Sequence, residues 1–130
     1  MEQIDVINEC SSRFNTAWGT RTEIEWPNTQ VSHSDVPFVR FSVMITASRN
    51  GTIGPSSKKR VKGFIVVQIF VEFGDGYADA YSLAGHVFDV FENQQFNGVI
   101  TFAGETVELG RDPDNSSLYI LNAKIPFEAM

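Results

Sequence analysis

The densest chemical signal in this 130-residue sequence is a basic cluster near its middle. Lys58, Lys59, Arg60 and Lys62 hold four of the ten Lys and Arg residues within five positions, beside a segment rich in Gly, Ser and Pro. Such a cluster can bind nucleic-acid phosphates or the acidic surface of a partner, with an affinity that falls as salt rises. A solvated loop that keeps a strand edge soluble would have the same composition. The basic cluster is therefore the candidate contact site, with both interpretations open.

No pattern of residues in the sequence predicts catalysis. Gly74-Asp75-Gly76 could place an anion at a helix N-terminus, but the glycine spacing of nucleotide-binding loops is missing and Asp75 would repel the anion. His33 and His86 have no further ligand at metal-binding spacing, and Cys10 falls in the apolar stripe of a predicted helix, where a thiol is inert. The carboxylates are scattered and define no acid/base pair. We expect no catalytic residue, no metal, no cofactor and no enzymatic activity.

Charge and cysteine content narrow the class of protein further. The formal net charge is −6 and the pI is near 4.8, which argues against a general binder of nucleic acids or anionic membranes. One cysteine excludes an internal disulfide. The N-terminus lacks the basic start and apolar run of a signal peptide, and no segment reaches the roughly 18 apolar residues of a membrane span. We expect an intracellular protein without a membrane partner.

Hydrophobic spacing predicts two helices that would hold these residues in place. Apolar side chains recur at three- and four-residue steps over about residues 2–18, where Gly19 ends the helix, and again over about residues 77–92. In the first helix the expected buried stripe comprises Ile4, Ile7, Ser11, Phe14 and Trp18, flanked by Val6, Cys10 and Ala17. In the second it includes Tyr77, Ala80, Tyr81, Ala84, Val87, Phe88 and Phe91. Both helices are amphipathic and need a sheet to cover.

Between the predicted helices lies a long apolar β-hairpin. Residues 36–46 and 60–73 are rich in β-branched and aromatic residues, and residues 47–59 contain the turn dipeptides of a long flexible loop. The basic cluster thus falls where this loop enters the second strand. A loop of this length exceeds what a hairpin needs, so we expect it to act as an assembly arm.

The remaining strands complete one domain over residues 1–130. Short strands are predicted at 23–26, 99–102, 106–109 and 118–127. The elements do not alternate strictly as βαβ units, which predicts an α+β fold: a mainly antiparallel sheet with a long β-hairpin and two helices packed on one face. Eleven Phe residues supply large buried areas, some of which could serve an intersubunit surface.

Several short motifs, in this order, resemble the phage tail terminator-like proteins. The resemblance covers nearly the whole chain and rests on structural motifs without a catalytic signature. The motifs are Trp26-Pro27-Asn28, Val36-Pro37-Phe38, a loop containing Gly54, Arg60-Val61-Lys62-Gly63, Val67-Gln68-Ile69-Phe70, Gly74-Asp75-Gly76, Val87 to Phe91 and Ile125-Pro126-Phe127.

The resemblance implies a structural virion protein that forms a homo-oligomeric ring, typically a hexamer, at the head-proximal end of a phage tail. Such a ring caps the tail tube, ends its polymerisation and provides the surface for head-tail joining. Its partners would be the tail tube protein and a head-neck connector protein, with non-specific contact to DNA in the lumen, and assembly would take place in the host cytoplasm. The basic cluster would face an acidic neighbouring subunit or that DNA.

Three other functions stay open at this point. A head completion or neck connector protein would have a similar size and layout, and sequence does not separate it from a tail terminator. A small nucleic-acid-binding module would need a basic face with exposed stacking aromatics, against which the net charge of −6 counts. A small enzyme using scattered carboxylates would need a pocket that gathers them.

Overall fold

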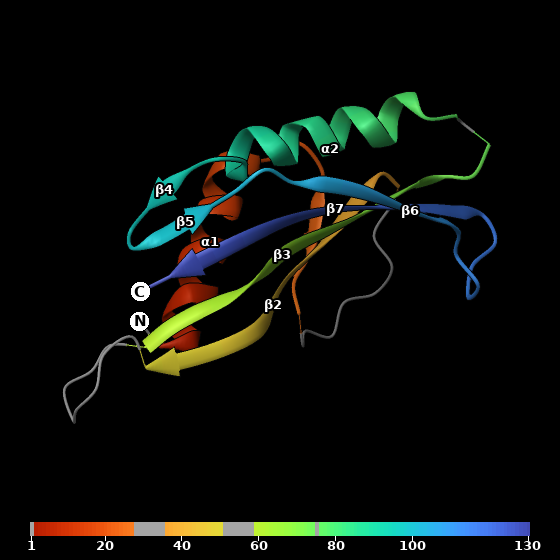
Figure 1. Cartoon of the computed structure of the whole chain (residues 1–130). Coiled ribbons are helices and arrows are strands. Elements are labelled where there is room, and N and C mark those ends of the chain that lie inside the picture. Colours follow the sequence, from red (N-terminus) through yellow and green to blue (C-terminus); the bar gives the residue numbers. More distant parts are fainter. Residues whose placement is uncertain (1, 28–35, 51–58, 75) are drawn as a thin grey trace.

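The structure is a computed structural model that describes residues 2–27, 36–50, 59–74 and 76–130. These residues form two helices and one sheet of seven strands (Figure 1). The elements in chain order are α1 (Gln3–Trp18), β1 (Glu23–Glu25), β2 (Phe38–Asn50), β3 (Lys59–Glu72), α2 (Ala78–Phe91), β4 (Gln95–Phe96), β5 (Val99–Thr101), β6 (Glu105–Arg111) and β7 (Leu118–Ala129).

Helix α1 forms where its apolar spacing predicts it, but its buried stripe differs in composition. The backbone N–H of Glu2 donates to the Asp5 carboxylate at 3.2 Å near the helix start, and Gly19 ends the helix with a φ of 60°. The stripe that packs inward is Val6, Cys10, Phe14 and Trp18, at steps of four residues. Ile4 was expected in this stripe and is instead 60% exposed, because it lies on the opposite side of the helix.

The sheet is mixed, which refines the expected mainly antiparallel arrangement. Strand order is β1-β2-β3-β7-β5-β4, with β6 also paired to β7. All pairs are antiparallel except β1 and β2, which run parallel. The Arg40 guanidinium of β2 pairs with the buried Glu25 carboxylate of β1 at 3.2 Å, which adds a charged contact to this short parallel pair.

The hairpin of β2 and β3 is longer than its sequence predicts. Its pairing continues from Phe38 opposite Phe70 to Asn50 opposite Lys59. Residues 47–50 and Lys59, expected in a loop, therefore belong to the strands, and residues 51–58 lie outside the described residues. Pairing along the partner strand satisfies the backbone of the Ala-Ser-Arg-Asn segment at 47–50, whose side chains alone favour turns.

Strand β7 lies at the centre of the sheet, which differs from a simple meander. Its whole length pairs with β3 on one side, while β5 and β6 pair with successive parts of its other side. Between them, the Phe102 N–H donates to the Pro126 carbonyl at 3.0 Å, and the Gly104 N–H donates to the Glu92 carboxylate at 2.7 Å. Strands β5 and β6 thus form one interrupted strand beside β7. Strand β4, which the sequence did not predict, pairs with β5 and forms a short flap.

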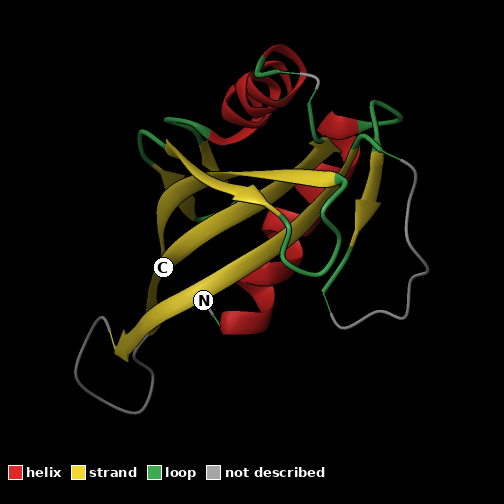
Figure 2. Ribbon diagram, turned by 90° about the vertical axis from the view of Figure 1, so that its right-hand side faces the viewer, coloured by secondary structure: helices red, strands yellow, loops and turns green. Residues whose placement is uncertain are grey.

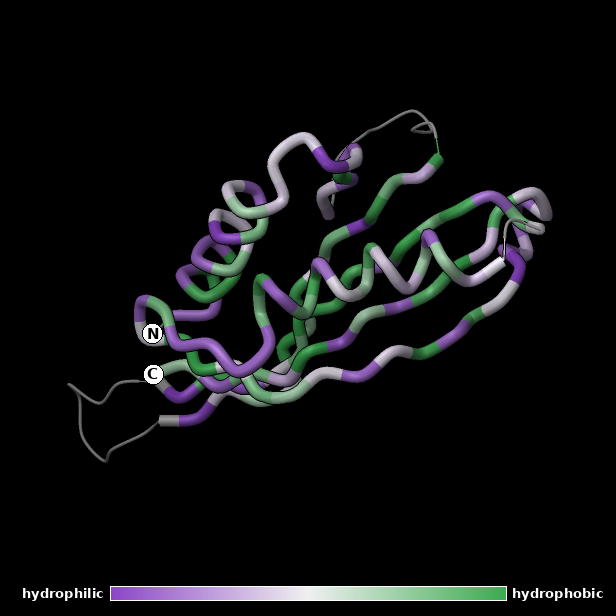
Figure 3. Tube along the Cα trace, turned by 90° about the horizontal axis from the view of Figure 1, so that it is seen from above, coloured by the Kyte–Doolittle hydropathy of each residue, from purple (hydrophilic) through white to green (hydrophobic). Residues whose placement is uncertain are grey.

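Both helices pack on the same face of the sheet and share one hydrophobic core with it (Figures 1 and 2). Along α1 hydrophilic and hydrophobic residues alternate within each turn, as expected of a helix with one buried side (Figure 3). Phe14 lies at the centre of an aromatic stack, with ring centroids 5.0 Å from Trp18, 4.9 Å from Phe41 and 5.9 Å from Phe91. This stack joins α1, β2 and α2, and so confirms that both predicted helices cover one face.

Candidate assembly surface

The face of the sheet turned away from α1 and α2 is the candidate functional surface, and we call it the helix-free face. Side chains alternate between the two faces of a sheet along each strand. In β3 and β7 the odd-numbered residues pack in the core, so the even-numbered residues lie on the helix-free face. One end of this face is filled by a small buried cluster of Phe38, Phe70, Leu118 and Ile120. The other end, toward the hairpin tip, is open.

An apolar row crosses the open end of the helix-free face. Met44 of β2 lies opposite Phe64 of β3, Phe64 lies opposite Pro126 of β7, and Pro126 accepts the hydrogen bond from Phe102. Met44 is 53% exposed and Phe102 is 43% exposed. The Lys124 ammonium lies 4.1 Å from the centroid of the Phe64 ring. This apolar row borders a shallow groove of about 300 Å³, and partly exposed apolar side chains in a continuous row are typical of contact surfaces.

The structure brings part of the predicted basic cluster beside this row. Arg60 and Lys62 lie on the helix-free face of β3, and both are exposed. The backbone of Lys59 pairs with that of Asn50 at the end of the hairpin, and Lys58 lies outside the described residues. The contact role of the cluster stays a prediction.

Arg49 is a further basic residue of this surface that sequence reasoning missed. It lies directly opposite Arg60 in the hairpin and is exposed. Like charges on opposed residues of neighbouring strands repel each other, so the pair favours binding of a negative group. The register of the hairpin is the signal that would have found it, and that register was hidden because residues 47–50 were expected in a loop.

Lys62 differs from Arg60 because it already has a partner. Its ammonium lies 2.8 Å from the Glu128 carboxylate across the β3–β7 pair. The hydrogen bond from Lys62 holds the pKa of Glu128 below its ordinary value, and the charge of Arg60 lowers that pKa further. The charge of Lys62 is therefore less available to an external partner than the charges of Arg49 and Arg60.

This ion pair predicts a pH-dependent contribution to stability. Since the folded-state pKa of Glu128 is lowered, the contribution is fully present above the ordinary carboxyl pKa of 4.5 and is lost as the pH falls through the lowered value. We expect the stability advantage of the parent over Glu128→Gln to be small at pH 7 and to vanish in acid. Denaturant unfolding at a series of pH values measures it, and 1 M salt should shrink the difference at pH 7. A difference that grows on acidification would contradict the assignment.

A second exposed apolar area lies at the opposite end of the sheet, around the start of α2. Tyr77 is 61% exposed and Tyr81 is 41% exposed, although both were expected on the buried side of the helix. Their rings contact each other at 5.8 Å, and the Tyr81 hydroxyl donates to Glu108 of β6 at 3.0 Å. Ala80, Leu83 and Ala84 cover the core at this end of α2, so the two tyrosine rings lie to one side of the buried stripe. Tyrosine is a frequent residue at protein interfaces.

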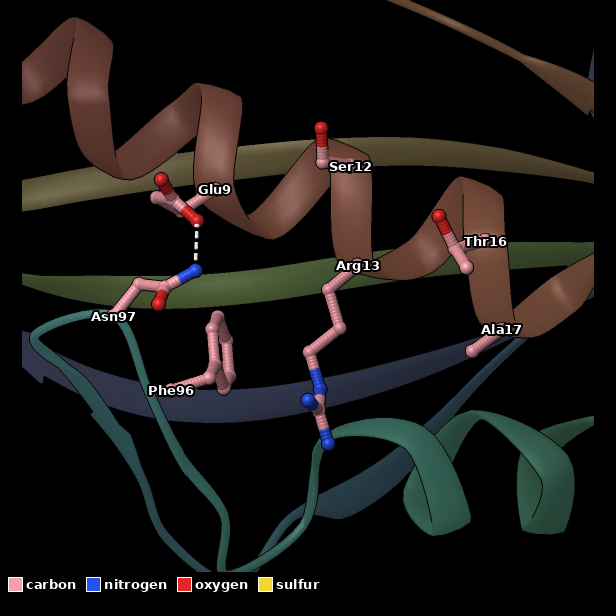
Figure 4. Close-up of a pocket in the computed structure, with 7 residues that line it drawn as sticks. All are labelled: Glu9, Ser12, Arg13, Thr16, Ala17, Phe96 and Asn97. Carbon is pink, nitrogen blue, oxygen red and sulfur yellow. Dashed lines mark hydrogen bonds between the residues drawn. The ribbon is translucent and has the colours of Figure 1, made fainter.

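A groove of about 410 Å³ lies between α1 and the β4–β5 flap (Figure 4). The polar side chains of Arg13, Glu9 and Asn97 in this groove bind other parts of the chain. The Arg13 Nε donates to the Val90 carbonyl at 2.9 Å, and its guanidinium lies over the Phe96 ring at 4.5 Å. Asn97 donates to the Glu9 carboxylate at 2.7 Å. Arg13 thus satisfies a carbonyl near the end of α2 and fastens the flap to α1.

The other candidates from the sequence lie apart from this surface. Cys10 is buried in the core, where burial raises the pKa of its thiol to about 12. His86 is half-buried on α2, while His33 and Asp75 lie outside the described residues. Among the residues that the structure describes, no three His, Cys, Asp or Glu side chains gather as a metal site. Neither α1 nor α2, the two described helices, is long and apolar enough to cross a membrane.

Comparisons with known proteins agree with this architecture. A sequence model for the family described as phage tail terminator protein matches residues 8–117. One solved protein chain that carries no functional description shares the fold, with a TM-score of 0.64, 15% sequence identity and 93% of each chain covered. At that identity the likeness shows the fold alone. No curated protein sequence matches this chain.

Proposed function

Because the chain belongs to the phage tail terminator protein family, we propose that it forms a ring that caps the tail tube at its head-proximal end. The family assigns the chain a structural role in a phage tail. In the proposed role the ring ends polymerisation of the tube and provides the surface for head-tail joining. Its partners are other copies of the chain, the tail tube protein and a head-neck connector protein.

The observation that carries this proposal is the uncovered helix-free face. A sheet with helices on only one side leaves its other side to water unless a partner covers it. Here that side carries the exposed apolar row around Met44 and Phe102, next to Arg49 and Arg60. A subunit whose second face is completed by assembly suits a heterologous interface that closes into a ring.

In this proposal the basic residues near the end of the hairpin bind a negatively charged partner. The chain as a whole has a net charge of −6, so local positive charge at the hairpin tip is an exception to an acidic surface. Arg49 and Arg60 on the helix-free face would meet DNA phosphates in the lumen or an acidic patch of a neighbour, as the basic cluster at Lys58, Lys59, Arg60 and Lys62 was expected to do.

The proposed function can be tested by comparing tail assembly in the absence and in the presence of the protein. In its absence, tubes should grow beyond their normal length and fail to join heads, and adding the purified protein should restore both. Electron microscopy of tube lengths and native mass of the protein, alone and with tube ends, are the measurements. A protein that stays monomeric, binds no tube end and leaves tube length unchanged would exclude the proposal.

Charge reversal tests the basic cluster within this function. Changing Lys58, Lys59, Arg60 and Lys62 to Glu should weaken ring assembly, tail joining or DNA passage by about tenfold, most strongly at low salt. Arg60→Glu can be compared with Arg21→Glu, an exposed arginine just after α1 that gives the same change in net charge. If all three properties persist after reversal at the four positions, the cluster has no contact role.

A further inference from the structure

Besides the outer sides of the short strands β1 and β4, the described part of the sheet leaves two longer stretches of edge free, and the first is the hairpin-tip half of β2. Strand β1 pairs only with residues 38–40 of β2, and no other strand of the described residues pairs with that side. Along the remaining length Met44, Thr46, Ser48 and Arg49 are exposed. Backbone N–H and C=O groups on this edge are available to a strand from another chain.

The second free edge is β6. It pairs with β7 on one side, and within the described residues no strand pairs with its other side. Five of its seven residues are exposed, including the apolar Val107 and Leu109. Neither this edge nor the free part of β2 contains the Lys or Pro residues that soluble sheets commonly use to prevent edge pairing.

The two edges carry opposite charges. Arg49 lies on the free part of β2, whereas Glu105 and Glu108 lie on β6. Neither Arg49 nor Glu105 forms an ion pair with another described residue. Complementary charge on two unpaired edges favours contact between them and suppresses pairing of an edge with its own kind.

Strand direction also suits a ring. The successive antiparallel pairs β2–β3, β3–β7 and β7–β6 leave β6 antiparallel to β2. In a ring whose strands are inclined to the axis, as they are in a closed barrel, the rotation keeps the sense of the strands, so β6 of one copy meets β2 of the next in the antiparallel sense. Head-to-tail contacts of this kind close into a ring when the rotation closes.

We propose that neighbouring copies in the ring join edge to edge, with residues 47–49 of β2 pairing antiparallel to residues 105–107 of β6. This proposal rests on the ring of the proposed function. Irregular pairing at Thr46 and at Leu109 limits the regular parts of the two edges to these stretches. The register that places Arg49 opposite Glu105 also places Ala47 opposite Val107, and all four side chains lie on the helix-free face.

The edge pairing decides which face lines the lumen. In a closed wall of sheets the outer circumference is larger than the inner one, so the bulkier layer of α1 and α2 lies outside. The helix-free face then forms the inner wall, with Arg49, Arg60 and Lys124 pointing inward. The hairpin tip and the Tyr77–Tyr81 end lie at opposite rims of the ring.

A charge swap tests the proposed register. Arg49→Glu and Glu105→Arg should each weaken subunit association about tenfold, and the double variant should recover most of the loss, because the swapped pair has the same attraction. The controls are Arg21→Glu and Asp89→Arg, which change net charge equally at exposed positions on neither edge. Concentration-dependent native mass measurements give the affinities. Equal losses in the swap and the control variants would overturn the pairing.

Cross-linking tests the same contact without altering charge. Ala47→Cys mixed with Val107→Cys should give covalent dimers with a short bifunctional maleimide, and a chain with both changes should give a ladder that ends at the ring. Cys10 is buried and does not compete. Thr16→Cys on the exposed side of α1 replaces Val107→Cys as the control.

The outcomes separate this inference from the proposed function. A ring of normal mass that yields no β2–β6 cross-link overturns the edge pairing and leaves the tail terminator function intact. Absence of a ring, both in solution and on tube ends, overturns both. Covalent dimers from the Ala47→Cys and Val107→Cys mixture, absent in the Thr16→Cys control, support the edge pairing.

Discussion

Phe14→Ala is expected to lower the free energy of unfolding by about 3–5 kcal/mol, the largest effect of any substitution considered. Phe14 is fully buried, and its ring contacts Trp18, Phe41 and Phe91 from three different elements. Removing the ring leaves a cavity at the centre of this stack, where rigid rings on several sides limit collapse. Equilibrium unfolding in urea, followed by tryptophan fluorescence, measures the change.

Ile4→Ala on the same helix is the matched control for Phe14→Ala. Ile4 is 60% exposed, so its truncation should change the free energy of unfolding by no more than about 0.5 kcal/mol. Similar losses at the two positions would mean that α1 does not bury the Val6-Cys10-Phe14-Trp18 stripe, and the shared core of both helices would be wrong.

Gly63→Ala is expected to destabilise the fold by about 3 kcal/mol and to distort the hairpin that carries the candidate surface. A Cβ at position 63 would collide with the Met44 carbonyl oxygen and approach the Ile45 Cα to 3.0 Å. Both obstacles are backbone atoms of the opposing strand, so side-chain movement cannot relieve the clash. Since Met44 and Phe64 flank this contact, the apolar row would shift with the strands.

Gly85→Ala separates this steric effect from the general effect of adding a methyl group. Gly85 lies within α2, and a Cβ there meets no atom within 4 Å. The change should stabilise the protein by about 0.5–1 kcal/mol, because alanine loses less backbone entropy than glycine in a helix. Differential scanning calorimetry of both variants shows the contrast, and a Gly63→Ala variant as stable as the parent would rule out the close strand approach.

Much of the fold could be predicted because the relevant signals are local. The helix over residues 3–18 and the helix over residues 78–91 follow from apolar spacing, and the two long strands follow from runs of β-branched and aromatic residues. Errors occurred where composition and tertiary pairing disagree. Residues 47–50 have the composition of a turn, yet a ladder with β3 holds them in a strand.

The candidate surface was predicted only in part, for a related reason. Arg60 and Lys62 stood out because they are close in sequence, whereas Arg49 joins them only through the hairpin register. The apolar row likewise gathers Met44, Phe64, Phe102 and Pro126 from separate segments. Tyr77 and Tyr81 show the converse case, since helical spacing placed them in the buried stripe, whereas α2 buries Ala80 and Ala84 and leaves both rings at the side of that stripe.

The sequence by itself determined the two amphipathic helices and the apolar hairpin, since these depend on the spacing of neighbouring residues. Resemblance of its short motifs also identified the family that the comparison later matched. Only the tertiary structure decided that β7 lies between β3 and β6, that one sheet face stays without helices, and that β2 and β6 end as free edges. These features depend on pairing between distant segments, whose partners and register are chosen by the burial of the whole core.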